Sequence, residues 1–181
     1  MLKSIILLIL SLFSIGLANA QNALSDKDLE LLDKEIEQKA IYDKAKIARI
    51  DSLKNNALTS STDDHKRFEA YFDLGKEYET FISDSALFYF DKALSISNTL
   101  KDSTLIICAN LGRIKTLAIL GYFMEGITAL NKVESSTIPE SLKSEWLDTS
   151  RQLYAYITTY AYGNKELYDK YNKLLNYYRD K

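Results

Sequence analysis

The sequence predicts an all-α protein, a superhelical array of about three helical hairpins behind a long N-terminal helix. Apolar residues recur at intervals of three and four along most of the chain, as they do on one face of an α-helix. The 181 residues include one proline and six glycines, fewer than the many turns of an all-β protein usually need. Hydrophobic residues make up 46% of the chain and charged residues 27%, values typical of a folded globular protein.

Residues 1–20 have the pattern of a signal peptide. Lys3 precedes an apolar run over residues 5–13, and the segment closes on Ala18-Asn19-Ala20, a small-x-small cleavage site. The apolar run is too short to span a bilayer comfortably. We therefore expect cleavage before Gln21 and an exported, periplasmic chain with no membrane insertion after cleavage. An uncleaved membrane anchor is the alternative.

Residues 21–57 predict a long N-terminal helix. Ser25 is a suitable N-cap, and the helix should run from about Asp26 to about Asn55. Its apolar stripe consists of Leu29, Leu32, Ile36, Ala40, Ile47, Ile50 and Leu53. Because the stripe is thin, the helix either packs on one neighbour, forms a coiled coil with a partner chain, or is solvated. Polar residues 56–64 predict a linker to the next element.

Residues 58–181 predict three helical hairpins. In the first, two segments with apolar residues at helical spacing, 68–81 and 86–98, flank a break at Ser83-Asp84-Ser85. In the second, a strongly apolar helix (105–120) turns at Gly121-Tyr122 into residues 124–133. The third begins at Pro139, where the missing N–H is harmless to a helix, and turns at Gly163-Asn164.

The second helices of the first two hairpins align with each other. Ala86, Phe90 and Ala93 match Gly126, Leu130 and Val133. With the Leu74-Gly75-x-x-Tyr78 motif, this pattern resembles the tetratricopeptide repeat, in which two antiparallel helices meet through a small residue. The spacing of 40 to 42 residues exceeds the usual 34, and Leu111-Gly112 is two places out of register. Longer helices, or a generic hairpin array, would explain both departures.

The long helix and the repeats together resemble the exported sensor region of a family of transcriptional regulators. The matching residues are Leu29 to Asp33, Ile36, Tyr42, Lys46 and Arg49 to Lys54. In that family, which is typical of Bacteroidetes, the exported region precedes a transmembrane helix and a cytoplasmic output region. The resemblance implies either a stand-alone sensor or the severed front half of a membrane-anchored regulator.

Charge and cysteine content argue against several functions. The formal charge is −2 and no Lys/Arg run is present, so we expect no nucleic-acid binding. Cys108 is the single cysteine, which excludes an internal disulfide and a cysteine-rich metal site. We interpret Cys108 as a buried small hydrophobe and His65, the single histidine, as a solvated helix-start residue. We expect no metal and no cofactor.

No catalytic motif is recognisable. The chain has no Gly-rich phosphate loop, no H-E-x-x-H and no G-x-S-x-G. Four acidic residues cluster in sequence and are best read as solvated helix faces: Glu134, Glu140, Glu145 and Asp148. We predict that the protein is not an enzyme. A hydrolase acting on envelope polymers is the alternative from another class.

Candidate binding residues come from the tyrosines and from two polar residues in an apolar helix. Eight of the thirteen tyrosines lie between residues 154 and 178. We expect Tyr156 and Tyr160 to share a face and, with Tyr78, to form part of a binding groove; ordinary packing is the alternative. Asn110 and Arg113 should line the concave groove, reach water or be paired internally, because burying an unpaired arginine is costly.

The last helix carries a candidate partner or homodimer face. Its members are Tyr168, Tyr171, Leu174 and Tyr178. No further repeat follows to cover this face, and an uncovered face promotes association. The function we predict is an exported, non-catalytic module that docks a peptide or protein in its concave face. A self-associating structural protein is a further alternative.

Overall fold

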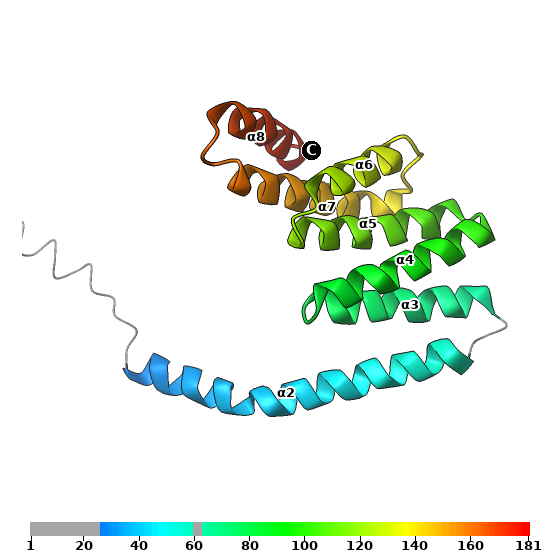
Figure 1. The fold of residues 1–181 in the computed structure, drawn as a ribbon, viewed down its shortest axis with the longest axis vertical. Coiled ribbons are helices and arrows are strands. Elements are labelled where there is room, and N and C mark those ends of the chain that lie inside the picture. Colours follow the sequence, from blue (N-terminus) through cyan, green and yellow to red (C-terminus); the bar gives the residue numbers. More distant parts are fainter. Residues whose placement is uncertain (1–25, 60–62) are drawn as a thin grey trace, which may run out of the picture. The chain divides into compact units, whose positions relative to one another are not determined.

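The computed structural model describes residues 26–59 and 63–181, and this part of the chain contains seven helices and no strand (Figure 1). The predicted all-α class is confirmed. The predicted signal peptide lies outside the described residues. The helices are α2 (Asp26–Thr59), α3 (Asp64–Glu79), α4 (Ser83–Leu100), α5 (Ser103–Ile119), α6 (Phe123–Glu134), α7 (Glu140–Tyr160) and α8 (Lys165–Arg179).

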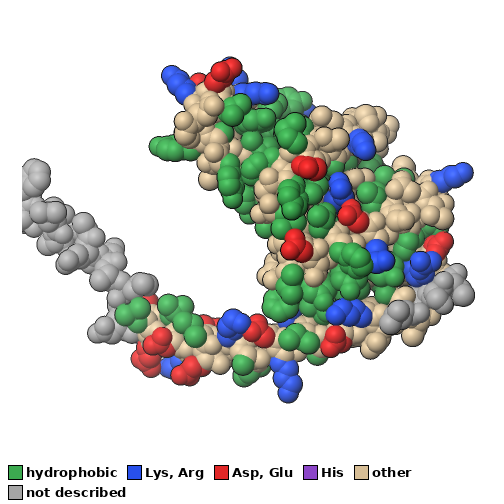
Figure 2. Space-filling view, viewed as in Figure 1, with side chains coloured by type: hydrophobic (Ala, Val, Ile, Leu, Met, Phe, Trp, Pro, Cys, Tyr) green, Lys and Arg blue, Asp and Glu red, His purple; other side chains and the backbone are tan. Residues whose placement is uncertain are grey.

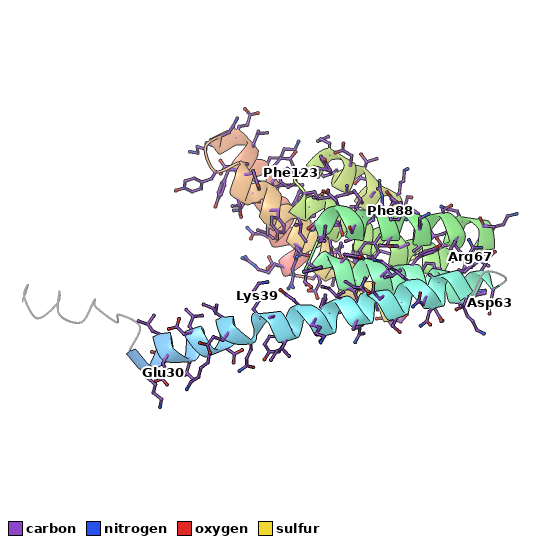
Figure 3. The ribbon with its side chains drawn as sticks, turned by 60° about the horizontal axis from the view of Figure 1, so that its bottom comes forward. Glu30, Lys39, Asp63, Arg67, Phe88 and Phe123 are labelled. Atoms are coloured by element: carbon purple, nitrogen blue, oxygen red, sulfur yellow. The ribbon has the colours of Figure 1, made fainter. Side chains whose placement is uncertain are left out.

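Helix starts follow local capping chemistry. The Asp63 carboxylate accepts a hydrogen bond from Lys66 N at 3.1 Å and begins α3 (Figure 3). Asp102 caps α5 and Asn164 caps α8 in the same way. Side chains of this kind satisfy backbone N–H groups that the first helical turn leaves free. Gly121 has φ of 79°, a left-handed conformation that glycine adopts without strain, and it makes the turn into α6.

Three helical hairpins form the array, as the sequence predicts. Helix α3 packs on α4, α5 on α6, and α7 on α8. Helix α4 also packs on α5, and α5 on α7, so each hairpin is joined to the next (Figure 1). The small and large positions matched in the sequence alignment, Ala86, Phe90, Ala93, Gly126, Leu130 and Val133, are all buried.

Phe90 on α4 explains the two Leu-Gly motifs. A Cβ atom on Gly75 of α3 would lie 2.6 Å from Cε1 of the Phe90 ring, and one on Gly112 of α5 would lie 2.4 Å from the same atom. Both glycines therefore face one ring, which is fully buried. Gly112 is out of register with Gly75 because it faces the aromatic ring of the preceding hairpin rather than one of its own.

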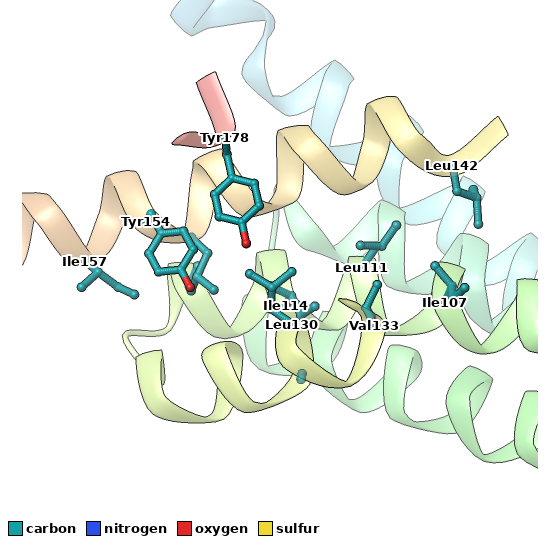
Figure 4. Close-up of a cluster of buried hydrophobic side chains, with 12 residues drawn as sticks. Ile107, Leu111, Ile114, Leu130, Val133, Leu142, Tyr154, Ile157 and Tyr178 are labelled. Atoms are coloured by element: carbon teal, nitrogen blue, oxygen red, sulfur yellow. The ribbon is translucent and has the colours of Figure 1, made fainter. Parts of the chain in front are cut away.

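A second core joins the last two hairpins (Figure 4). Leu111 and Ile114 of α5, Leu130 of α6 and Leu153 of α7 are each fully buried there. Tyr178 of α8 is 5% exposed in this cluster, and its ring stacks on Tyr154 with centroids 5.5 Å apart. The last helix is thus held to the array by an aromatic side chain within the core.

Among the described residues, the structure divides the chain inside α2, between Ala45 and Lys46. The division expected from the sequence was at residues 57/58. The second half of α2 belongs to the repeat unit because Ile50 and Ala57 are buried against α3 and α4. Lys46 Nζ lies 2.8 Å and Arg49 Nε 2.5 Å from the Glu77 carboxylate of α3.

The predicted linker over residues 56–64 is wrong in its first part. Helix α2 continues to Thr59, whose hydroxyl donates to the carbonyl oxygen of Asn55 at 3.0 Å. Burial of Ala57 in the adjoining cluster stabilises these helical turns, although asparagine and threonine are weak helix formers.

Within the described residues, one segment is long and apolar enough to span a membrane, by length and composition alone: Ser103–Leu120. This segment comprises α5, which packs against α3, α4, α6 and α7. Its apolar character is that of a helix at the centre of a core.

Candidate functional site

A cleft of about 640 Å³ lies on the repeat unit and draws side chains from all three hairpins. Its lining residues come from the first helix of each hairpin (α3, α5 and α7) and from α8. The lining residues are Glu79, Lys115, Asp148, Arg151, Gln152, Ala155, Leu175 and Arg179. In an array of helical hairpins, one helix from each hairpin contributes to a continuous binding surface, and this cleft follows that plan.

Lys115 of α5 lies among acidic groups from the neighbouring helices. Its Nζ is 3.1 Å from Oε1 of Glu145 on α7, a pair that joins two successive hairpins. Glu79, the last residue of α3, is half-buried. Burial raises the pKa of Glu79 above its ordinary value, while Lys115 partly offsets this effect. The carboxylate thus loses hydration that a bound cationic or N–H donor group could replace.

The cleft also carries two guanidinium groups, those of Arg151 and Arg179. Arg151 pairs with Asp148 one turn earlier on α7, and both side chains are exposed. Arg179 Nε on α8 lies 3.6 Å from Asp180, also in an exposed position. Because exposed pairs of this kind contribute little stability, both arginines remain free to exchange these partners for the carboxylate or carbonyl oxygens of a ligand.

The groups that line the cleft are suited to binding a ligand. Charges of both signs, the Gln152 amide and the apolar Ala155 and Leu175 suit an extended polypeptide, which presents the same mixture of groups. Across residues 26–59 and 63–181, no cluster of three His, Cys, Asp or Glu side chains could hold a metal ion.

Asn110 and Arg113 lie in a different groove from the cleft. This groove, of about 360 Å³, lies between α4, α5 and α6. Arg113 Nε is 2.6 Å from Oδ1 of Asp91 on α4, and the Asn110 amide donates to Ile106 O at 2.8 Å. Arg113 thus lines a groove and stays partly exposed while it pairs with Asp91, and the pair ties α5 to α4.

The three tyrosines predicted for a groove occupy separate places. Tyr78 is 8% exposed and stacks on Tyr89 with centroids 5.4 Å apart, so it packs in the core. Tyr156 is half-buried against the core of the last two hairpins. Tyr160 is exposed and meets the edge of Phe123. The structure does not bring them together in one groove.

Much of the predicted partner face on α8 is turned into the chain. Tyr178 is buried and donates a hydrogen bond to the Glu134 carboxylate, so its assignment to a partner face is wrong. Tyr171 stacks on Tyr154 at 6.3 Å, and Leu174 packs against the same core. Tyr168 is half-buried beside Tyr162. These contacts are those of side chains that pack between the paired helices of one chain.

The remaining sequence interpretations concern single residues. His65 is exposed in the first turn of α3. Cys108 is half-buried on α5, and burial raises the pKa of its thiol, as expected for a small hydrophobe. The clustered acids do not form one site, since each has its own cation or hydroxyl partner: Lys143 for Glu140, Lys115 for Glu145, Arg151 for Asp148 and Tyr178 for Glu134.

Sequence reasoning missed most of the cleft. Glu79, Lys115, Arg151, Gln152 and Arg179 were not singled out, because charged residues at helical spacing are indistinguishable from a solvated face. One signal was available: Lys115 stands in the most apolar helix, two residues after Arg113. Two residues correspond to about 200° around a helix, so the two cations must serve opposite faces.

The fold and the cleft define a helical repeat protein of the tetratricopeptide type, a class that generally mediates protein interactions and is typically non-catalytic. Residues 36–181 match the family described as the SusR N-terminal TPR domain, and the chain belongs to this family. SusR is a regulator of Bacteroidetes, so both resemblances seen in the sequence are confirmed. Comparison with curated proteins and with solved structures gave no match.

Proposed function

We propose that this protein is an exported, non-catalytic binding module that docks a peptide or protein segment in the cleft. The observation that carries the proposal is the cleft itself, in which α3, α5, α7 and α8 present charges of both signs together with the apolar Ala155 and Leu175. A polypeptide supplies carboxylates, amines and backbone amides to match these groups. Membership of a family of regulator domains supports a role as the sensor part of a signalling system.

A capture experiment tests the docking site. Immobilised protein is incubated with periplasmic extract, and the retained polypeptides are compared between the wild type and the Arg151→Glu/Arg179→Glu variant. We expect the variant to lose the retained partner. The control is Lys132→Glu, a single charge reversal of the same kind in the groove between α4, α5 and α6. Equal loss with both variants, or retention by both, would contradict docking in the cleft.

Export is tested separately. We expect cell fractionation to place the protein in the periplasm and intact-mass measurement to give a chain that begins at Gln21. A membrane-bound protein that keeps residues 1–20 would contradict the proposal.

The second candidate function is the front half of a membrane-anchored transcriptional regulator. It is favoured by the family match, which is to an N-terminal domain of the Bacteroidetes regulator SusR. Sequencing of the DNA beyond codon 181 distinguishes the two. A reading frame that continues into a transmembrane helix supports the second candidate, whereas a stop codon supports the stand-alone module.

A further inference from the structure

The first part of α2 is an exposed amphipathic helix. Every residue from 27 to 42 is exposed, including the apolar Leu29, Leu32 and Ile36, at 43%, 50% and 59%. These three and Ala40 follow one another at steps of three and four, so they lie on one face of the helix. We call this face the α2 stripe. Apolar side chains lie open along this part of α2 in Figure 2.

Such a face indicates a binding partner. A helix in a protein derives most of its stability from packing of its apolar face, and burying an exposed leucine or isoleucine is favourable. Within the described residues of this unit, 26–45, no other helix is present to cover the stripe.

We propose that the α2 stripe pairs with the α2 stripe of a second copy of this chain, in antiparallel orientation. This pairing is separate from docking in the cleft and does not rest on the proposed function. It joins two identical faces about a two-fold axis, the commonest symmetry of protein dimers.

The distribution of charge along α2 selects the orientation. Residues 27–37 contain five acidic and two basic side chains, whereas residues 38–45 contain two basic and one acidic. A parallel pair would set the acidic segments of both copies side by side. An antiparallel pair sets the acidic segment of each copy against the basic segment of the other, which is the favourable arrangement.

The charges beside the stripe match the same arrangement residue by residue. At about 100° per residue, Glu35 and Lys39 lie on one flank of the stripe, and Glu30 and Lys44 lie on the other. Both pairs are centred on residue 37. In an antiparallel pair like flanks meet, so Glu35 faces Lys39 of the second copy and Glu30 faces Lys44 of the second copy. Figure 3 labels Glu30 and Lys39 at separate turns of α2.

The charges of α2 therefore complement those of a second, antiparallel α2, and this is the reason to name a second copy as the partner. An unrelated helix would need the reverse charge order by chance, whereas the α2 sequence supplies it. The pairs within each helix, Lys34 with Glu30 and Lys39 with Asp43, are exposed and weak, so they do not prevent the new ones.

Cysteine cross-linking tests both the pairing and its direction. In a Cys108→Ser background, single cysteines replace Ile36 or Leu29, and dimers are measured after mild oxidation. About the centre at residue 37, the two copies of position 36 lie within one helical turn of each other, and the two copies of position 29 lie about 24 Å apart along the axis. We expect Ile36→Cys to cross-link and Leu29→Cys not to.

A third cysteine variant, Leu167→Cys, places a thiol at an exposed position on α8. Efficient cross-linking there, with none at Ile36→Cys, would mean that the second copy docks through the C-terminal helix and would overturn the proposal. Equal cross-linking of Ile36→Cys and Leu29→Cys would overturn the antiparallel direction.

Sedimentation velocity tests the energetics. Ile36→Ser should raise the dimer dissociation constant at least about tenfold, because the side chain is buried in both copies. Glu35→Lys and Lys39→Glu should each weaken the dimer, and the double variant Glu35→Lys/Lys39→Glu should restore it. Circular dichroism confirms that each variant keeps its helices. A wild type that stays monomeric at all concentrations would overturn the proposal.

Discussion

Gly112→Ala should destabilise the fold although it replaces a glycine inside a helix. The new methyl carbon would lie 2.4 Å from Cε1 of Phe90, well inside van der Waals contact. The Phe90 ring is fully buried and also lies against Gly75, so neither the ring nor the helices can move away without disturbing the packing of α3, α4 and α5. The substitution therefore forces two hairpins apart.

The expected magnitude combines two opposing effects. Overpacking of a close-packed core costs about 1–3 kcal/mol. Replacing glycine by alanine inside a helix returns up to about 1 kcal/mol through helix propensity. The free energy of unfolding should therefore fall by about 1–2 kcal/mol.

Urea denaturation followed by circular dichroism measures this change. The matched control is Gly163→Ala, because a Cβ at position 163 has open space around it. That variant should be as stable as the wild type or slightly more so. The double variant Gly112→Ala/Phe90→Leu should recover part of the loss suffered by Gly112→Ala, since the smaller side chain makes room for the methyl group. Gly112→Ala with unchanged or increased stability would refute the placement of Phe90 between the two glycines.

Three further predictions concern buried polar groups. Thr149→Val should raise the free energy of unfolding by about 1 kcal/mol, as measured by urea denaturation. The reason is that the buried Thr149 hydroxyl has no hydrogen-bond partner among the described residues. A fall in the free energy of unfolding would mean that this hydroxyl does form a hydrogen bond. Burial raises the pKa of Glu79 from its ordinary 4.5, so the folded state binds this proton more tightly than the unfolded state and the carboxylate destabilises the fold as the pH rises above that value. Glu79→Gln should thus melt at a higher temperature than the wild type at pH 7 but not at pH 4, and an equal difference at both pH values would exclude this linkage. Burial also raises the pKa of the Cys108 thiol, so a thiol reagent at pH 8 should label it slowly in the native protein and rapidly in urea; equally fast labelling would show that the thiol is open to solvent.

The positions of the helices could be predicted from capping residues and from the spacing of small and apolar residues in the sequence. Asp102 and Asn164 begin helices in the structure because their side chains accept backbone hydrogen bonds, a property visible in the sequence. The small positions Ala86 and Ala93 are fully buried where two helices meet, as their alignment with the second hairpin indicates. These features depend on residues near in sequence, so pattern reasoning was sufficient for them.

The residues of the cleft depend on packing between helices, which the sequence alone does not specify. Lys115 meets Glu145 across 30 positions of chain, and Glu79 owes its raised pKa to burial by neighbouring helices. The sequence also does not specify which tyrosines pack inside the chain. Tyr178 has the spacing of an open helix face, but its ring packs on Tyr154 and its hydroxyl donates a hydrogen bond to Glu134, 44 residues earlier.

The packing of Tyr178 also gives the protein an internal spectroscopic reporter. Trp146, the single tryptophan of the chain, meets the Tyr178 ring edge-on at 5.9 Å, and the Lys181 ammonium lies 5.1 Å from the indole centroid. Release of α8 would expose the indole to water and remove both neighbours, so tryptophan emission reports on the last hairpin. Circular dichroism reports on every helix. Comparison of the two signals during denaturation therefore reveals whether the array melts as one cooperative unit or opens first at its C-terminal end.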